Sequence, residues 1–165
     1  MIKTLKTATG WLAFCPVLLL LSGSAAQATQ PQDDTPFQTV EKYLFSGHTQ
    51  AKNYVITSDE DWERLWLIVH NSDTPPLPGI DFTKQMIIAV FQGEKSSGGY
   101  GIAITDLIKV GKRLRVKVTE LEPDLSCVTL TVVEQPYHII VTERLSKKVL
   151  RNVSFEVEEK VQSCK

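Results

Sequence analysis

The stretch MIIAVFQGEKSSGGYGIAI, residues 86–104, decides the fold class of this chain. Met86 to Phe91 is an unbroken aliphatic and aromatic run, which is typical of a central strand covered on both faces. Gly98 and Gly99 then permit a tight turn, because glycine adopts positive φ without a steric penalty. A second apolar strand is predicted from Tyr100 to Ile104. Two buried strands are therefore expected on either side of a loop whose exposed lip runs from Glu94 to Gly99.

Further strands are predicted along the rest of the chain. Residues 113–119 alternate strictly, with apolar side chains on one face and basic side chains on the other, and residues 153–157 alternate in the same way with glutamates on the polar face. These basic and acidic stripes could pair across a sheet. The remaining predicted strands cover residues 37–45, 51–57, 128–133 and 139–142.

One amphipathic helix is predicted over about residues 59–70. Ser58 is a suitable N-cap, and Trp62, Leu65, Trp66 and Val69 recur at helical spacing. This stripe is interpreted as core rather than as a ligand platform. The fold class is therefore mainly β: an antiparallel β-sandwich or partly closed barrel over residues 37–165, with the helix covering one opening.

The first 36 residues are interpreted as a signal segment followed by a leader. Lys3 and Lys6 precede an apolar run, and Ala26-Gln27-Ala28 is a small-x-small cleavage site, so cleavage after Ala28 is expected. The apolar run is too short for stable membrane insertion, and Cys15 lies in a poor lipoprotein motif. Export to the periplasm or the exterior is expected, with residues 29–36 as a disordered leader.

The charge balance and the cysteines restrict the function further. The chain has 18 basic against 19 acidic residues, which does not suggest a nucleic-acid surface. Loss of Cys15 with the signal segment would leave Cys127 and Cys164, an even pair that predicts one disulfide in an oxidising compartment.

The motifs of common active sites are missing from the sequence. Tyr100 and an apolar strand follow the glycines where a phosphate-binding loop needs Lys and Ser or Thr before a helix. No histidines or cysteines share a metal-ligand spacing, and neither a metal nor a cofactor is expected. Cys127, His138 and Asp124 form the one local trio suited to catalysis, so a small hydrolase using Cys127 and His138 is kept as an alternative to a non-catalytic domain.

Two short elements are the candidate binding residues. Glu94, Gly98, Gly99 and Tyr100 form the first, and Pro136, Tyr137 and His138 form the second. A tyrosine beside each chain break offers a large contact area at a small entropic cost. The alternative is a purely structural role, in which both elements close the ends of the core.

The same residues carry a family resemblance. The span from Asp81 to about Glu143, with GEKSSGGY, Cys127 and PYHIIV in that order, resembles the C-terminal domain of the PrcB family, which consists of subunits of secreted protease complexes. The resemblance implies a β-rich extracytoplasmic domain that binds or stabilises a protease without cleaving substrate itself. It places the family's signature on Gly93, Gly98, Gly99, Tyr100, Cys127, Pro136, Tyr137 and His138.

A second alternative is a protease inhibitor. The glycine-tyrosine loop and the proline-aromatic pair are similar to the loops with which chagasin-like inhibitors plug the cleft of a cysteine protease. Strict up-and-down strands would put the loop 93–99 and the break 134–136 at opposite ends of the domain. They share an end only if one of the intervening connections is not a reversal.

Overall fold

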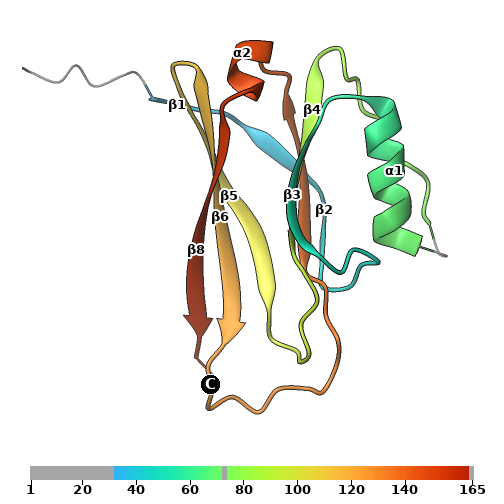
Figure 1. The fold of residues 1–165 in the computed structure, drawn as a ribbon, viewed down its shortest axis with the longest axis vertical. Coiled ribbons are helices and arrows are strands. Elements are labelled where there is room, and N and C mark those ends of the chain that lie inside the picture. Colours follow the sequence, from blue (N-terminus) through green and yellow to red (C-terminus); the bar gives the residue numbers. More distant parts are fainter. Residues whose placement is uncertain (1–31, 72–73, 164–165) are drawn as a thin grey trace, which may run out of the picture.

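The computed structural model describes residues 32–71 and 74–163 (Figure 1). The expected signal segment, Cys15, the cleavage site at Ala28 and Cys164 all lie outside the described residues. The described part is mainly β, as expected, and forms two four-stranded sheets that pack as a sandwich without closing into a barrel.

The first sheet has the strand order β1-β5-β6-β8, and the second has the order β2-β7-β4-β3. The elements are β1 (Gln32–Asp34), β2 (Phe37–Tyr43), β3 (Ala51–Ile56), α1 (Asp59–His70), β4 (Gln85–Gln92), β5 (Gly101–Val110), β6 (Arg113–Pro123), β7 (Tyr137–Glu143), α2 (Lys147–Leu150) and β8 (Val153–Gln162).

Strand β4 lies between two cores, as its unbroken apolar run predicts. Ile87, Ala89 and Phe91 face helix α1, whereas Met86, Ile88 and Val90 face the other sheet. Helix α1 therefore covers the outer face of the second sheet and does not close an opening of a sandwich. Figure 1 shows the resulting three layers, from the first sheet through the second sheet to α1.

Helix α1 has the predicted bounds and cap. Ser58 Oγ accepts the Asp61 N–H, and the four predicted stripe residues are all buried. The indoles of Trp62 and Trp66 donate hydrogen bonds to the carbonyls of Pro78 and Pro75 at 3.0 and 2.9 Å. The tryptophans are thus core residues that also hold residues 75–78, here called the proline segment, against the helix by hydrogen bonds.

Strand β8 departs from the expected antiparallel pattern, because it pairs parallel with β6. The chain leaves the first sheet after β6, forms β7 in the second sheet and returns through α2, so no hairpin imposes an antiparallel neighbour. The expected pairing of charged stripes is confirmed, since Glu156 lies 3.8 Å from Arg115 and 3.7 Å from Lys117.

Three other expectations are corrected. Residues 128–133 form no strand, because their apolar side chains meet no opposing sheet and β-propensity depends on such packing. Gln32–Asp34, predicted to be disordered, instead pair with the edge of β5 as β1. The first predicted strand ends at Tyr43, two residues early.

Candidate functional site

The loop that carries the first predicted binding element meets the segment that precedes the second one at one end of the sandwich. This end lies opposite α2 and is built from residues 93–100 and 124–136, here called the end loops (Figure 1). Lys95 N donates to the Glu134 carbonyl at 2.8 Å, and Glu134 N donates back to the Lys95 carbonyl at 3.0 Å. Gly98 N adds a hydrogen bond to the Leu130 carbonyl at 2.9 Å.

The end loops meet because the connection from β6 to β7 crosses between the sheets. It starts at the end of β6, carries no strand, and enters β7 beside β4. Strands β4, β5, β6 and β7 still alternate in direction, so the loop after β4 and the connection from β6 to β7 lie at the same end. The predicted strand over residues 128–133, which would put them at opposite ends, is absent.

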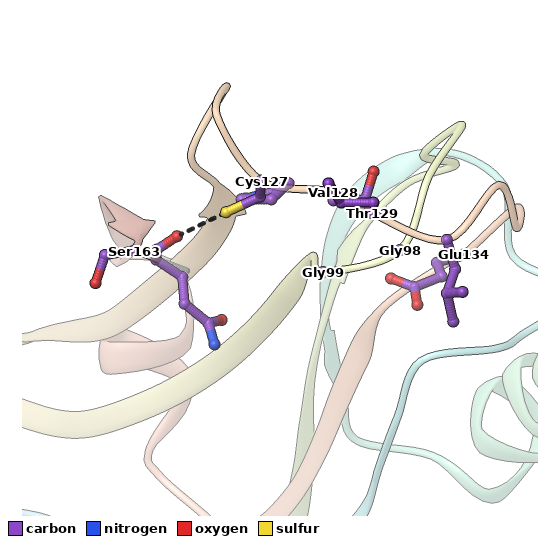
Figure 2. Close-up of a pocket in the computed structure, with 10 residues that line it drawn as sticks. Gly98, Gly99, Cys127, Val128, Thr129, Glu134 and Ser163 are labelled. Atoms are coloured by element: carbon purple, nitrogen blue, oxygen red, sulfur yellow. Dashed lines mark hydrogen bonds between the residues drawn. The ribbon is translucent and has the colours of Figure 1, made fainter. Parts of the chain in front are cut away.

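A pocket of about 290 Å³ lies between the end loops, and we call it the end pocket. Gly98, Gly99, Thr129 and Glu134 line it together with the last residues of β8 (Figure 2). Gly99 has φ of 98°, and a Cβ there would lie 3.2 Å from the Pro123 Cβ. A Cβ on Gly98 would lie 3.4 Å from Glu134 Oε1. The glycines thus allow the turn to pass close to the opposing loop.

The end pocket is lined by a buried carboxylate, that of Glu134, and a lysine, Lys95, lies on the same loop as the lining glycines. Glu134 is buried, and its Oε2 accepts the Tyr100 N–H at 3.4 Å. Lys95 Nζ lies 4.9 Å from the centroid of the Tyr100 ring and 3.9 Å from Glu122 Oε1. Burial raises the pKa of the Glu120 carboxyl, and the charge of Lys95 partly opposes this shift.

The outer part of the end loops exposes apolar side chains. Val128 is fully exposed and Leu130 is 79% exposed, and Leu125 and Val133 are also open to solvent. Several large apolar side chains on one loop are a surface that a partner protein could cover. The sequence predicts a strand for residues 128–133 and therefore does not indicate this surface. The apolar residues are visible in the sequence, but their exposure depends on the crossover between the sheets.

The second predicted element is mostly buried. Pro136 is buried and its carbonyl accepts the Gln92 N–H at 3.0 Å. The Tyr137 ring stacks on Phe91 with centroids 5.8 Å apart, and burial, assisted by the charge of Glu41, raises the pKa of its hydroxyl above the ordinary value. Glu94, by contrast, is exposed and accepts a long hydrogen bond from Gln135.

His138 lies between the two sheets. Its Nε2 is 2.9 Å from Thr39 Oγ1 on β2, and its Nδ1 accepts the Ile104 N–H of β5 at 2.9 Å. Cys127, the other member of the hydrolase alternative, lines the end pocket, with its Sγ directed to the end of β8 and 3.7 Å from the Gln162 carbonyl oxygen (Figure 2). The sulfur of Cys127 therefore lies in the end pocket, whereas the imidazole of His138 lies in the core between the sheets.

Two absences hold for the described ranges 32–71 and 74–163. They contain no group of three or more His, Cys, Asp or Glu side chains placed to hold a metal ion. No helix within them is long and apolar enough to cross a membrane.

The fold and the site define a two-sheet β-sandwich with a loop-built, partly apolar end. Residues 86–143 match the family model described as PrcB C-terminal, so the resemblance seen in the sequence is confirmed over that segment. The matched segment runs from β4 to β7 and contains both end loops. Comparison with curated proteins gave no match, and neither did comparison with solved structures.

Proposed function

We propose that this chain is an exported, non-catalytic interaction domain that binds or stabilises a secreted or periplasmic protease. The observation that carries the proposal is the meeting of the two end loops within the PrcB C-terminal segment, with Val128 and Leu130 exposed on them. An exposed apolar loop held in place by backbone hydrogen bonds loses little conformational freedom when a partner covers it.

The test is capture of the partner by the mature protein. Tagged residues 29–165 are incubated with an envelope or secreted fraction of the source organism, and bound proteins are identified by mass spectrometry. Leu130→Asp places a charge on the end loops, whereas Leu77→Asp makes the same change at another exposed leucine, in the proline segment 75–78. We expect a protease to be recovered by the wild type and by Leu77→Asp and to be lost with Leu130→Asp.

Two outcomes of the capture experiment would contradict the proposal. Recovery of no protease by the wild type, or equal recovery by both variants, would mean that the end loops do not bind one. A mass measurement of the exported protein checks the expected processing, because cleavage elsewhere than after Ala28 or retention of residues 1–28 would contradict the proposed route.

Inhibition is a second candidate, and one observation favours it. The glycine-tyrosine loop and the segment before Pro136 lie at the same end of the domain, as two loops that enter one protease cleft must. A panel of cysteine and serine proteases is assayed with the purified mature protein. Inhibition that Leu130→Asp weakens and Leu77→Asp leaves unchanged would support this candidate, and full activity of every protease would remove it.

A further inference from the structure

A second pocket, of about 490 Å³, lies beside the end loops at the last turn of α1. We call it the aromatic pocket. Glu41, Tyr43 and Phe45 line it from β2 and the residues that follow, and His70 lines it from α1. Gln135 of the end loops and Tyr137, the first residue of β7, complete this part of the lining. Glu41 and His70 lie outside the segment matched by the family model, so this pocket is not explained by the family resemblance.

The pocket contains the carboxylate of Glu41, which accepts a hydrogen bond from the neutral Tyr137 hydroxyl and has one oxygen without a well-aligned hydrogen bond. Glu41 Oε2 lies 3.0 Å from His70 Nε2, but neither atom makes a hydrogen bond of acceptable geometry. The Glu41 side chain is 30% exposed and that of His70 is 13% exposed. Among the described residues, no lysine or arginine lines the pocket. A half-buried carboxylate therefore faces the pocket with a histidine and a tyrosine hydroxyl beside it and with no lysine or arginine in the described lining.

Two exposed aromatic rings stand beside this carboxylate. Tyr43 is 57% exposed and Phe45 is 44% exposed, and their rings meet edge to face with centroids 5.7 Å apart. Aromatic faces attract ammonium and guanidinium groups through the ring quadrupole. Rings next to a carboxylate are the two components with which proteins commonly recognise an organic cation.

The walls of the aromatic pocket are fixed by the backbone. Gly47 N donates to the Val69 carbonyl at 2.8 Å, and a Cβ on Gly47 would lie only 2.3 Å from the Ile68 carbonyl oxygen. Asn71 ends the helix with φ of 50° and ψ of −119°, a sparsely populated conformation for a residue other than glycine. The Gln135 N–H donates to the Leu44 carbonyl at 2.8 Å. These contacts form the pocket before any ligand binds.

We propose that the aromatic pocket binds a cationic side chain, a lysine ammonium or an arginine guanidinium, of an extended segment of a partner protein. The carboxylate of Glu41 neutralises the cation, and Tyr43 and Phe45 contact its aliphatic stem and charged head. The pocket adjoins the end loops through Gln135, so one partner could occupy both. This inference rests on the proposed function in one respect only: the partner protein that binds the end loops also supplies the cationic side chain.

The experiment uses short blocked peptides with the isotope-labelled mature protein. Ac-Gly-Lys-Gly-NH2 and Ac-Gly-Arg-Gly-NH2 are titrated while amide resonances are followed by NMR, and Ac-Gly-Gln-Gly-NH2 is the neutral control. We expect saturable shifts at Phe45, His70 and Gln135 with at least one cationic peptide and none with the neutral one. Spermidine is titrated in a separate arm to distinguish a free polyamine from a side chain.

Matched variants isolate the charge. Glu41→Gln keeps the size of the side chain and should weaken peptide binding about tenfold, the loss expected for one charge-assisted contact. Glu63→Gln removes the same charge from the exposed face of α1 and should leave the affinity within about twofold. Tyr43→Ala, at an exposed position, should also weaken binding.

The results separate this inference from the proposed function. Absence of peptide binding, or equal weakening by both glutamate variants, would overturn the cation site even if the end loops still capture a protease. Binding of spermidine alone would overturn the assignment to a protein side chain. Peptide binding that depends on Glu41 would support the site even if no protease is captured.

Discussion

His138 on β7 and Ile104 on β5 join the two sheets by a hydrogen bond through the core. The Ile104 N–H donates to His138 Nδ1 at 2.9 Å, so Nδ1 carries no proton, and the neutral ring holds its proton on Nε2, facing Thr39 Oγ1. Protonation of Nδ1 would break the bond between the sheets. A histidine considered as a catalytic base from the sequence is therefore a neutral structural residue in this environment.

The stability of the protein should fall on acidification because of His138. Burial, with a smaller repulsion from Lys42, lowers the pKa of the His138 imidazole to about 4. The unfolded chain takes up this proton near pH 6.5, so it binds more protons than the folded chain between pH 6.5 and 4. The contribution of His138 is complete above about pH 6.5, and about 2 kcal/mol of it should be lost by pH 4.5.

Urea unfolding at several pH values tests this prediction. Other groups also titrate, so the informative quantity is the difference between the wild type and His138→Gln. The variant should be less stable at pH 7, and its free energy of unfolding should fall less steeply toward pH 4.5. Parallel profiles for the two proteins would show that His138 does not control the acid response.

Replacement by alanine should lower the stability of the protein most at Gly93, less at Gly99 and least at Gly79. Gly93 has φ of 78° and a Cβ would lie 2.7 Å from Ala51 N, so Gly93→Ala should cost most, on the order of 3 kcal/mol. Gly99→Ala should cost about 1–2 kcal/mol, because of its φ of 98° and its approach to Pro123. Gly79 has open space around it, and Gly79→Ala should change stability by less than about 1 kcal/mol. Thermal unfolding of the three variants measures the order, and an equal loss in all three would contradict it.

The elements that depend on local pattern could be predicted from the sequence. The apolar stripe that begins at Trp62, together with the N-cap, predicts both the bounds and the buried face of α1, because helical spacing and capping are local properties. The unbroken run from Met86 to Phe91 indicated a strand covered on both faces, since a strand with one solvated face would alternate.

The features that depend on tertiary contacts could not be predicted. The exposure of Leu130 follows from the crossover of residues 124–136 between the sheets, which no local pattern encodes. Glu41 and His70 are 29 positions apart and belong to different elements, so no motif in the sequence indicates the aromatic pocket. Tyr137 and His138 are candidate binding residues in the sequence because they follow Pro136 at a chain break, but the structure places both side chains in the core.

Truncation of a side chain in the core between the two sheets should destabilise the protein much more than truncation on the exposed side of α1. Ile88 is fully buried between the sheets, and Ile88→Ala should cost about 2–5 kcal/mol through lost burial and the cavity left behind. Ile68 lies on the exposed side of α1, so Ile68→Ala should stay within about 0.5 kcal/mol. Equilibrium unfolding in urea checks the contrast, and a cost below 1 kcal/mol for Ile88→Ala would mean that the core between the sheets is not packed as described.

The disulfide between Cys127 and Cys164 stays a prediction, because Cys164 lies outside the described residues. Cys127 Sγ is 3.7 Å from the Gln162 carbonyl oxygen, which places the Cys127 sulfur next to the end of β8, and this end is two positions before Cys164 in the sequence. A protein comprising residues 29–165, produced under oxidising conditions, should gain about 2 Da on reduction. In the oxidised protein, Cys127→Ser and Cys164→Ser should each lower the free energy of unfolding by about 3–4 kcal/mol, and the double variant should lose no more than either single one, because all three lack the same loop closure. Alkylation of both cysteines without prior reduction, or additive losses in the double variant, would contradict the pairing.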